Sequence, residues 1–318
     1  MNCEQFRFSA TIDWIDVRVT LKKATNFQTV QRKFPSLTVE KPFVKPCAPD
    51  SKNNTTAVFT IRIQDPTSPA SVQRQLDQLS EQLPFTAPAH ITGVEVSLDA
   101  FLGVEAYRGD LLGEMAVQLF NSHAKLVGDW RVLGRIGSMG EVRHPTTLQE
   151  LRAAMVRDGL TVFVGGKDAD ITQRFYFKRT DGSAKATELH RFLPESEHRA
   201  RCEVTLRNSA CPFRIIEEWQ SFKFERLSKY FKFRSLKALG SDPTSFDTIR
   251  HRMRSTMVRL SPDSGNPRDA EKVSKLLKEH RRTSDPNREA DTELNDRSYD
   301  ALRGLTMRYQ LRATSELT

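Results

Sequence analysis

The chain has 318 residues, an apolar fraction of 38% and a formal net charge of +9. This length is sufficient for a substantial hydrophobic core, and the composition excludes a largely disordered chain. The positive charge favours a polyanionic partner, such as nucleic acid or an acidic membrane surface, but it indicates no particular fold.

The N-terminus and the cysteines indicate the cellular compartment in which the protein is expected. The first residues, MNCEQFRFSA, lack the apolar segment of a signal peptide, and no stretch reaches the roughly 18 apolar residues that a membrane span needs. The four cysteines form no CxxC pair, which argues against a zinc site and a dense disulfide framework. We therefore expect a soluble cytosolic protein with reduced thiols.

Short runs of alternating apolar and polar residues predict strands in the first 210 residues. In chain order, these are Thr11–Thr20, Ala57–Ile63, Ile91–Phe101, Leu160–Val164, Thr172–Lys178 and Arg201–Arg207. Apolar side chains at three- and four-residue intervals predict helices at Ser71–Leu83, Asp110–His123 and Leu148–Val156. Because strands and helices mix without strict alternation, we expect an α+β fold with a largely antiparallel central sheet and flanking helices.

The composition changes after about residue 212. Between Pro212 and Leu260 there are 11 Lys or Arg against five Asp or Glu, with aromatic residues interleaved. This pattern predicts a basic helical C-terminal extension whose cations bind phosphate. Its aromatic side chains either fill the core or stack on bases, and core packing is the favoured outcome.

The remaining C-terminal residues alternate between polar and helical patterns. Segments 261–267 and 283–297 are rich in Ser, Pro, Asn, Asp and charge and predict linkers, with helices at 269–281 and 299–312. We therefore divide the chain into a domain at 1–210, a basic helical segment at 211–260 that packs on or next to it, and a charged linker with C-terminal helices at 261–318.

Two carboxylates on one predicted strand are candidates for chemistry. Glu95 and Asp99 lie four residues apart in VEVSLDAF, so they share a strand face at a Cα separation of about 13 Å. One metal ion could be bound by both only if the strand bends or bulges between them; otherwise one binds and the other supports it. Taken alone, the pair is more typical of solvent-facing strand positions than of a metal site.

The motif QRFYFK places a tyrosine between two cations. Alternation puts Arg174, Tyr176 and Lys178 on one strand face, and Phe175 and Phe177 on the other. Because the pKa of tyrosine is ordinarily near 10, adjacent cations would favour both a bound phosphate and the phenolate nucleophile. The same pattern also fits an amphipathic strand with surface cations.

A third motif, SEHRARCEVTLR, gathers charge on the last predicted strand of the domain. Alternation places Arg201, Glu203, Thr205 and Arg207 on one face. A Glu among arginines is commonly a surface ion pair of little energetic consequence. His198, just before the strand, would either bind a metal through a neutral ring nitrogen or cap the strand.

In this order and spacing, the motifs resemble the replication initiation factor family. That family includes initiators of small rolling-circle plasmids, some filamentous-phage replication proteins and relaxases of certain integrative elements. The resemblance covers about residues 8–210 and extends from RFSATIDWIDVRV through VEVSLDAF and LTVFVGGKDADITQRFYFK to SEHRARCEVTLR. Members usually carry Asp at the position of Glu95, and many have Ser-Arg in place of the Gly-Gly-Lys turn at 165–167. The His-x-His pair of HUH nickases is absent.

The resemblance implies a metal-dependent nickase that initiates rolling-circle replication. Tyr176 would attack a phosphodiester of single-stranded DNA, form a 5′-phosphotyrosine link and release a 3′-hydroxyl, with Arg174 and Lys178 at the phosphate. A Mg²⁺ or Mn²⁺ ion would be held by oxygen ligands, with a histidine as a further candidate. These implied ligands are Glu95, Asp99, Glu203 and His198.

The same resemblance implies a single-stranded or hairpin origin as partner, host replication machinery such as a helicase, a homodimer, and the cytoplasm of a bacterial host. The candidate DNA-binding cations are Arg201, Arg207, Lys167 and, on a helix predicted at Phe246–Leu260, Arg250, Arg252, Arg254 and Arg259. The second strand transfer would use a partner subunit, another tyrosine such as Tyr230, or water. The alternatives are a non-catalytic DNA-binding replication or regulatory protein and an RNA-binding module.

Overall fold

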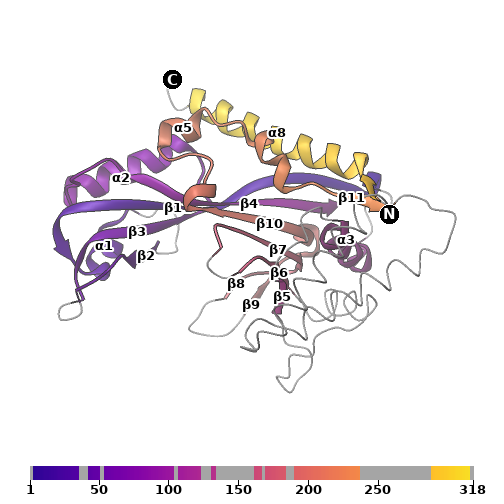
Figure 1. The fold of residues 1–318 in the computed structure, drawn as a ribbon, viewed down its shortest axis with the longest axis horizontal. Coiled ribbons are helices and arrows are strands. Elements are labelled where there is room, and N and C mark those ends of the chain that lie inside the picture. The colour runs from indigo at the N-terminus through magenta and orange to yellow at the C-terminus, as the bar shows by residue number, and fades with distance from the viewer. Residues whose placement is uncertain are drawn as a thin grey trace, which may run out of the picture.

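The fold is built on one large antiparallel sheet. A computed structural model describes residues 3–35, 42–50, 54–103, 107–122, 130–133, 161–166, 169–183, 190–236 and 288–315. Eight strands form the sheet in the order β2-β3-β1-β4-β10-β7-β6-β5, and each neighbouring pair is antiparallel (Figure 1). Helices flank the sheet, which confirms the predicted α+β class.

The large sheet contains the predicted strands and two short additional ones. Its members are β1 (Phe6–Thr25), β2 (Phe43–Pro46), β3 (Thr56–Gln64), β4 (His90–Leu102), β5 (Trp130–Leu133), β6 (Thr161–Val164), β7 (Ile171–Lys178) and β10 (Arg199–Arg207). Two small ribbons pair β8 (Thr180–Ser183) with β9 (His190–Phe192), and β11 (Arg234–Leu236) with β12 (Arg288–Ala290). All six predicted strands are confirmed, and β1 extends beyond its predicted bounds at both ends.

The helices are α1 (Phe27–Lys33), α2 (Pro69–Gln82), α3 (Gly109–Ser122), α5 (Ile216–Gln220) and α8 (Thr292–Ser315), with 3-10 turns η1 (Cys3–Gln5), η2 (Glu195–Glu197), η3 (Asn208–Ala210) and η4 (Phe224–Tyr230). The helices predicted at 71–83 and 110–123 are confirmed as α2 and α3. The third confirmed helix, α8, begins well before its predicted start at Tyr299. The cause is local: Asp291 accepts a hydrogen bond from the Leu294 backbone N–H (3.1 Å), which caps the helix inside a segment that composition predicts as a linker.

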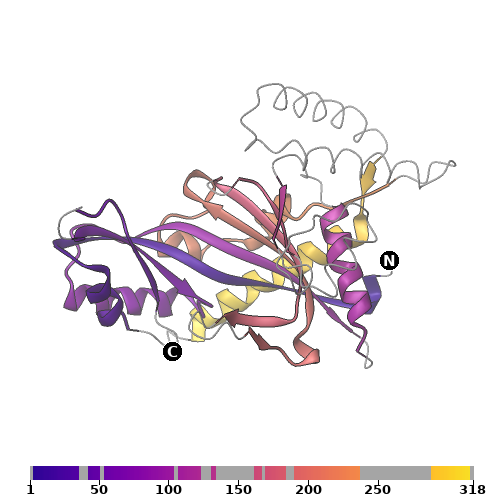
Figure 2. The same cartoon turned by 90° about the horizontal axis from the view of Figure 1, so that it is seen from below.

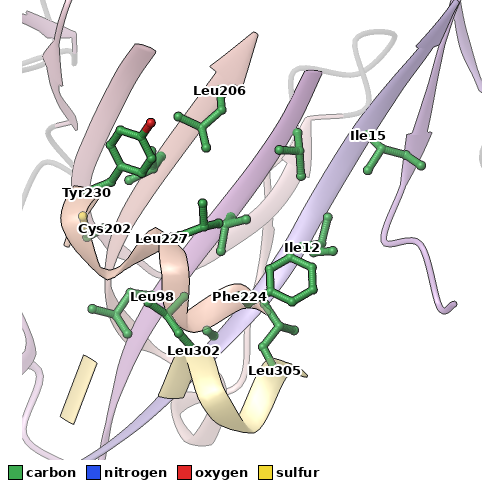
Figure 3. Packing of buried hydrophobic residues seen from close by; sticks show 14 of the residues in the cluster. Ile12, Ile15, Leu98, Cys202, Leu206, Phe224, Leu227, Tyr230, Leu302 and Leu305 are labelled. Carbon is green, nitrogen blue, oxygen red and sulfur yellow. The ribbon is translucent and has the colours of Figure 1, made fainter. Parts of the chain in front are cut away.

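Alternation along the central strands separates a helix-covered face from an open face. Viewed from the open side, α8 lies behind the strands (Figure 2). Apolar side chains from β1, β4 and β10 meet η4 and α8 in one core, where Ile12 lies near Phe224 and Leu305, and Leu98 lies near Leu302 (Figure 3). On β7, Phe175 packs against Phe120 of α3, with ring centroids 5.6 Å apart. Burial of this apolar surface is the main force that holds helices and sheet together.

The aromatic residues of the basic segment complete the core. Phe213, Trp219, Phe224, Phe231 and Phe233 are each no more than 1% exposed. Their predicted fate as core residues is therefore confirmed. None of the described helices is long and apolar enough to cross a membrane.

Several sequence predictions lie outside the described residues. They are the helices at Leu148–Val156, Phe246–Leu260 and 269–281, and the linker at 261–267.

Candidate active site

A β-bulge in β1 determines which side chains reach the open face. Ile12 pairs with Val96 and Trp14 pairs with Glu95, so Asp13 is an extra residue without a partner position on β4. A bulge of this kind re-aims side chains. Here, both Asp13 and Trp14 line the open-face groove, although neighbouring residues of a regular strand point to opposite faces.

Three carboxylates converge where the bulge faces β4 and β10. Oxygen atoms of Asp13, Glu95 and Glu203 lie within 4.8 Å of one another. Glu95 and Glu203 are 3% and 2% exposed, and Asp13 is half-buried. We name these three residues the acidic cluster. All three supply hard oxygen donors, and such a set could hold a divalent cation.

The acidic cluster is held by donors from neighbouring strands. Arg174 donates from Nη2 to Glu95 Oε1 (2.7 Å), and its Nε forms an ion pair with Glu203 Oε2. Thr205 donates to the other oxygen of Glu95 (2.5 Å), and Ser97 donates to Asp13. These contacts follow from the register, because Thr205 lies opposite Glu95 and Arg174 lies opposite Glu203.

Tyr176 lies directly beside the acidic cluster. Its hydroxyl donates a hydrogen bond to Glu203 Oε1 (2.6 Å). The phenol is half-buried and lines the groove, whereas Phe175 and Phe177 on the same strand are buried on the helix-covered side. The sequence thus placed Tyr176, Arg174 and Lys178 on the correct strand face.

The electrostatics around the phenol differ from the sequence-based expectation. Burial raises the pKa of Tyr176 well above its ordinary value of 10, and the charge of Glu203 adds to this, while Arg201 and Arg174 oppose it without offsetting it. Burial also raises the pKa of Glu203 from 4.5 to about 7, with Glu95 as the next cause. Burial thus outweighs the two arginines that were expected to favour the phenolate, and the phenol donates a hydrogen bond to Glu203.

Asp99 lies outside the acidic cluster. Register between β4 and β10 is unbroken from Ala100 to Gly93, so no bend brings Asp99 towards Glu95. The two irregularities in the pairing of β1 with β4 insert Asp13 on β1 and Thr92 on β4, and neither adds a residue between Glu95 and Asp99. Arg201 instead binds Asp99 through two nitrogens, each at 2.6 Å. Asp99 thus serves as the partner of a buried arginine.

Arg201 is a structural cation in this arrangement. It is 4% exposed, and besides Asp99 it donates to Asp13 (3.1 Å). Although burial lowers it, the pKa of Arg201 is raised well above its usual value by Asp99 and Asp13, so the guanidinium stays charged. Arg201 lines the groove, but its donors are directed at Asp99 and Asp13, and a contact between Arg201 and DNA stays a prediction.

His198 also lies apart from the acidic cluster. Its Nδ1 is 2.7 Å from the Tyr107 hydroxyl and its Nε2 is 3.0 Å from the Leu193 carbonyl oxygen. Its ring packs against Phe177, whose side chain points to the helix-covered face. Both ring nitrogens are therefore engaged on the side of the sheet that Tyr176 does not face.

An open groove of about 1080 Å³ runs over the polar face and includes the acidic cluster. Lys178 and Arg207 line it, as expected of residues that would contact a phosphate chain. The other predicted DNA-binding cations, Lys167, Arg250, Arg252, Arg254 and Arg259, lie outside the described residues. Tyr230, a candidate second nucleophile, is the last residue of η4 and is buried in the core (Figure 3).

Sequence reasoning missed Asp13, although a signal for it was present. Core-facing residues of β1 occupy even positions up to Ala10 and Ile12, and odd positions from Ile15 and Val17 onward. A phase change in the alternation marks an inserted residue. The residues between the two phases are Asp13 and Trp14, which is where the bulge lies.

Comparisons with known proteins add a distant structural likeness. No protein-family model matches the sequence, and a comparison with curated proteins finds no match. Among solved structures, the chain is similar to the rolling circle replication initiator protein from Geobacillus stearothermophilus, with 15% identity and a TM-score of 0.36. The match covers 74% of this chain and 90% of that chain. A likeness at this level assigns no function.

Proposed function

We propose that this protein is a metal-dependent DNA nickase and strand transferase that initiates rolling-circle replication. One observation carries the proposal: the Tyr176 hydroxyl lies 2.6 Å from Glu203, a member of the acidic cluster, within an open groove. A nucleophile, a base and a set of hard oxygen ligands next to one another are the groups that phosphodiester transfer requires. The net charge of +9 agrees with a nucleic-acid substrate.

The reaction starts from a protonated phenol. Glu203 Oε1, which already accepts the hydrogen bond of the Tyr176 hydroxyl, takes the proton as the Tyr176 oxygen forms a bond to phosphorus. The bond from phosphorus to the 3′ oxygen breaks, and that oxygen leaves as a 3′-hydroxyl after taking a proton from water. The 5′-phosphotyrosine link conserves the bond energy, so the strand can be rejoined without ATP.

The cations of the groove position the phosphate. Lys178 lies two residues from Tyr176 on the same strand face, where its ammonium group can meet a phosphate oxygen. Arg174 contacts two members of the acidic cluster and is about one-third exposed, so part of its guanidinium faces the groove. Together they counter the negative charge that develops in the transition state.

The acidic cluster fits a hard divalent cation such as Mg²⁺ or Mn²⁺. Its three carboxylates face two arginines, and one of these, Arg201, also pairs with Asp99, so negative charge remains that the arginines do not neutralise. Asp13, Glu95 and Glu203 would hold the ion. Once bound, it would supply Lewis-acid polarisation of a phosphate oxygen.

The central experiment is a covalent-adduct assay. Purified protein is incubated with Mn²⁺ and labelled single-stranded oligonucleotides that cover the candidate origin, and adducts are resolved by denaturing electrophoresis. We expect wild type to form an adduct and Tyr176→Phe to form none while it still binds DNA. The matched control is Tyr107→Phe, since Tyr107 is an exposed tyrosine outside the groove and should leave the adduct unchanged. An undiminished adduct in Tyr176→Phe would refute the proposal.

One observation favours a second candidate, a DNA-binding protein without catalysis. Arg174 and Arg201 already pair with the acids, which is how a purely structural ion network would look. Metal distinguishes the two functions, because a ligand that binds only the folded state raises its melting temperature. The nickase predicts that Mn²⁺ raises the Tm of wild type but not of Asp13→Asn. The binding protein predicts no response in either.

A further inference from the structure

The groove continues from Tyr176 across the sheet to its β2–β3 edge, where its chemistry changes. Phe43 on β2 is 57% exposed and lies directly opposite Arg62 on β3. Both line the groove that contains Tyr176 and the acidic cluster. An aromatic ring this exposed is unusual beside a polar groove, and it has no role in the proposed chemistry.

The planar guanidinium of Arg62 is held in one orientation by its neighbours. Its guanidinium lies 3.6 Å above the ring centroid of Trp14 and donates to both oxygens of Asp16, at 2.8 and 2.7 Å. The indole beneath it is 5% exposed, so Trp14 supports Arg62 and is not itself available to a ligand. Because contacts from below and from the side hold the guanidinium, little entropy remains to be lost when a ligand stacks on it.

Two further cations lie at the same end of the groove. Lys45 is exposed on β2, two residues from Phe43, and the Arg207 guanidinium lies 5.7 Å from the Trp14 ring. Both line the groove. Asp16 accepts both of its hydrogen bonds from Arg62, so its negative charge is paired with Arg62 and does not neutralise Lys45 or Arg207.

This combination selects the ligand. Planar groups offer stacking surfaces to a base, and nearby cations bind the phosphates that flank it. In a duplex, the base faces are already stacked on one another, so only an unpaired base can use such a surface. An acidic peptide would use the cations but would leave the planar groups without a function.

We propose that Phe43 and Arg62 form a stacking platform for an unpaired base of single-stranded DNA, on the same strand whose phosphate reaches Tyr176. This inference rests on the proposed function and adds the path of the substrate. Five strand-to-strand steps separate β7 from β2, or about 24 Å along the sheet at the usual spacing. The stacked base therefore lies several nucleotides from the cleaved bond, and Lys45 and Arg207 bind the intervening or flanking phosphates.

The first test measures affinity without cleavage. Binding of a fluorescent single-stranded oligothymidine to the full chain, without divalent metal, is followed by anisotropy at several salt concentrations. We expect Phe43→Ala to raise Kd by at least about fivefold, since loss of one stacked base costs roughly 1–3 kcal/mol. The matched control is Phe192→Ala, because Phe192 is 75% exposed on β9 and does not line the groove. It should bind as wild type does.

Salt dependence separates stacking from charge. Phe43→Ala should leave the slope of log Kd against log salt unchanged, whereas Lys45→Gln should reduce it by about the value of one phosphate contact. Both side chains are exposed, so neither change should lower the Tm. A duplex of the same sequence should show no sensitivity to Phe43→Ala.

A double-mutant cycle, with one change in the protein and one in the DNA, identifies the base that stacks on Phe43. With an oligonucleotide that carries the cleavage site, single abasic substitutions are scanned along the strand. At one position, several nucleotides from the cleaved bond, the abasic site and Phe43→Ala should each weaken binding, and their effects should not add.

Three outcomes would overturn the platform: unchanged affinity in Phe43→Ala, additive effects at every abasic position, or tighter binding to the ribose version of the strand. None of these depends on cleavage. A covalent adduct at Tyr176 with no effect at Phe43 refutes the platform alone, and a functional platform without an adduct refutes the nickase alone.

Discussion

The central strands have one face covered by helices and one face that opens onto the groove, and different forces hold the buried side chains of the two. On the helix-covered face, Leu98 and Phe175 lie in a hydrophobic core, where attraction is not directional. On the groove face, Glu95 and Glu203 are as deeply buried, yet each depends on a particular guanidinium or hydroxyl. An apolar side chain can pack against any apolar neighbour of suitable volume, whereas a buried charge needs an oppositely charged or hydrogen-bonding group beside it. The two faces should therefore respond differently to substitution.

The largest effect on stability is expected when a groove-face partner is removed. In Arg201→Met, Asp99 loses both of its 2.6 Å hydrogen bonds and Asp13 loses a donor. Breaking a buried ion pair in this way should lower the free energy of unfolding by about 3–5 kcal/mol at pH 7, as measured by urea denaturation. Adding Asp99→Asn removes a buried charge whose remaining ion pair is with Arg199, at 3.4 Å, and should recover part of the loss. No recovery would mean that the two side chains do not act as a pair.

On the helix-covered face, Leu98→Ala should cost about 2–5 kcal/mol, because it removes buried surface and leaves a cavity. The same denaturation assay measures this, with Ile171→Ala, at a position that is 38% exposed, as a control with a much smaller loss. The contrast between faces is sharpest for conservative changes. Leu98→Met should cost less than about 1.5 kcal/mol, whereas Arg201→Lys forfeits the two-pronged bond to Asp99. Equal tolerance of both changes would break the distinction between the faces.

The sequence predicted the division into two faces but not the pairs within the polar one. Alternation depends only on local geometry, so it correctly placed Phe175 inward and Tyr176 outward. Which carboxylate meets which cation depends on the register between β4 and β10, and no single strand reveals that register. Asp99 and Glu95 lie on the same face of one strand, so the alternation pattern cannot tell which of them binds Arg201 and which joins the acidic cluster.

The remaining misses also have physical causes. The bulge at Asp13 was visible only as a change of phase in β1, and the start of α8 was hidden because its capping residue, Asp291, lies in a polar segment that reads as a linker. Strand β2 is four residues long, too short for alternation to be recognised. Because Phe43 lies on this strand, the sequence pattern could not predict the stacking platform.

The acidic cluster should make stability depend on pH in an unusual direction. Between pH 4.5 and 7, the unfolded chain releases the proton of Glu203, whereas the folded protein keeps it, because burial and Glu95 raise the pKa to about 7. Stability from this group is therefore fully present below pH 4.5 and is lost as the pH rises through 7, with a change on the order of 3 kcal/mol. Denaturation midpoints between pH 4 and 8 measure this change.

The matched control for the pH dependence is Glu203→Gln, which keeps the shape and removes the titration. The difference in unfolding free energy between wild type and this variant should shift with pH in the stated direction. A difference that stays constant from pH 4 to 8 would show that Glu203 titrates at its ordinary pKa and is a weaker base beside Tyr176 than its burial implies.

Thr205→Val should have the smallest effect and tests how the acidic cluster is held. Thr205 donates to one oxygen of Glu95, and Arg174 donates to the other. Valine keeps the shape and removes only the hydroxyl, so Glu95 retains its charged partner, and the loss of stability should be about 1–2 kcal/mol. If Glu95 also binds the metal, a donor that orients it should affect metal affinity, by about tenfold or more in the Mn²⁺ concentration that raises the Tm. A lower stability with an unchanged response to Mn²⁺ would instead show that Arg174 alone sets the position of Glu95.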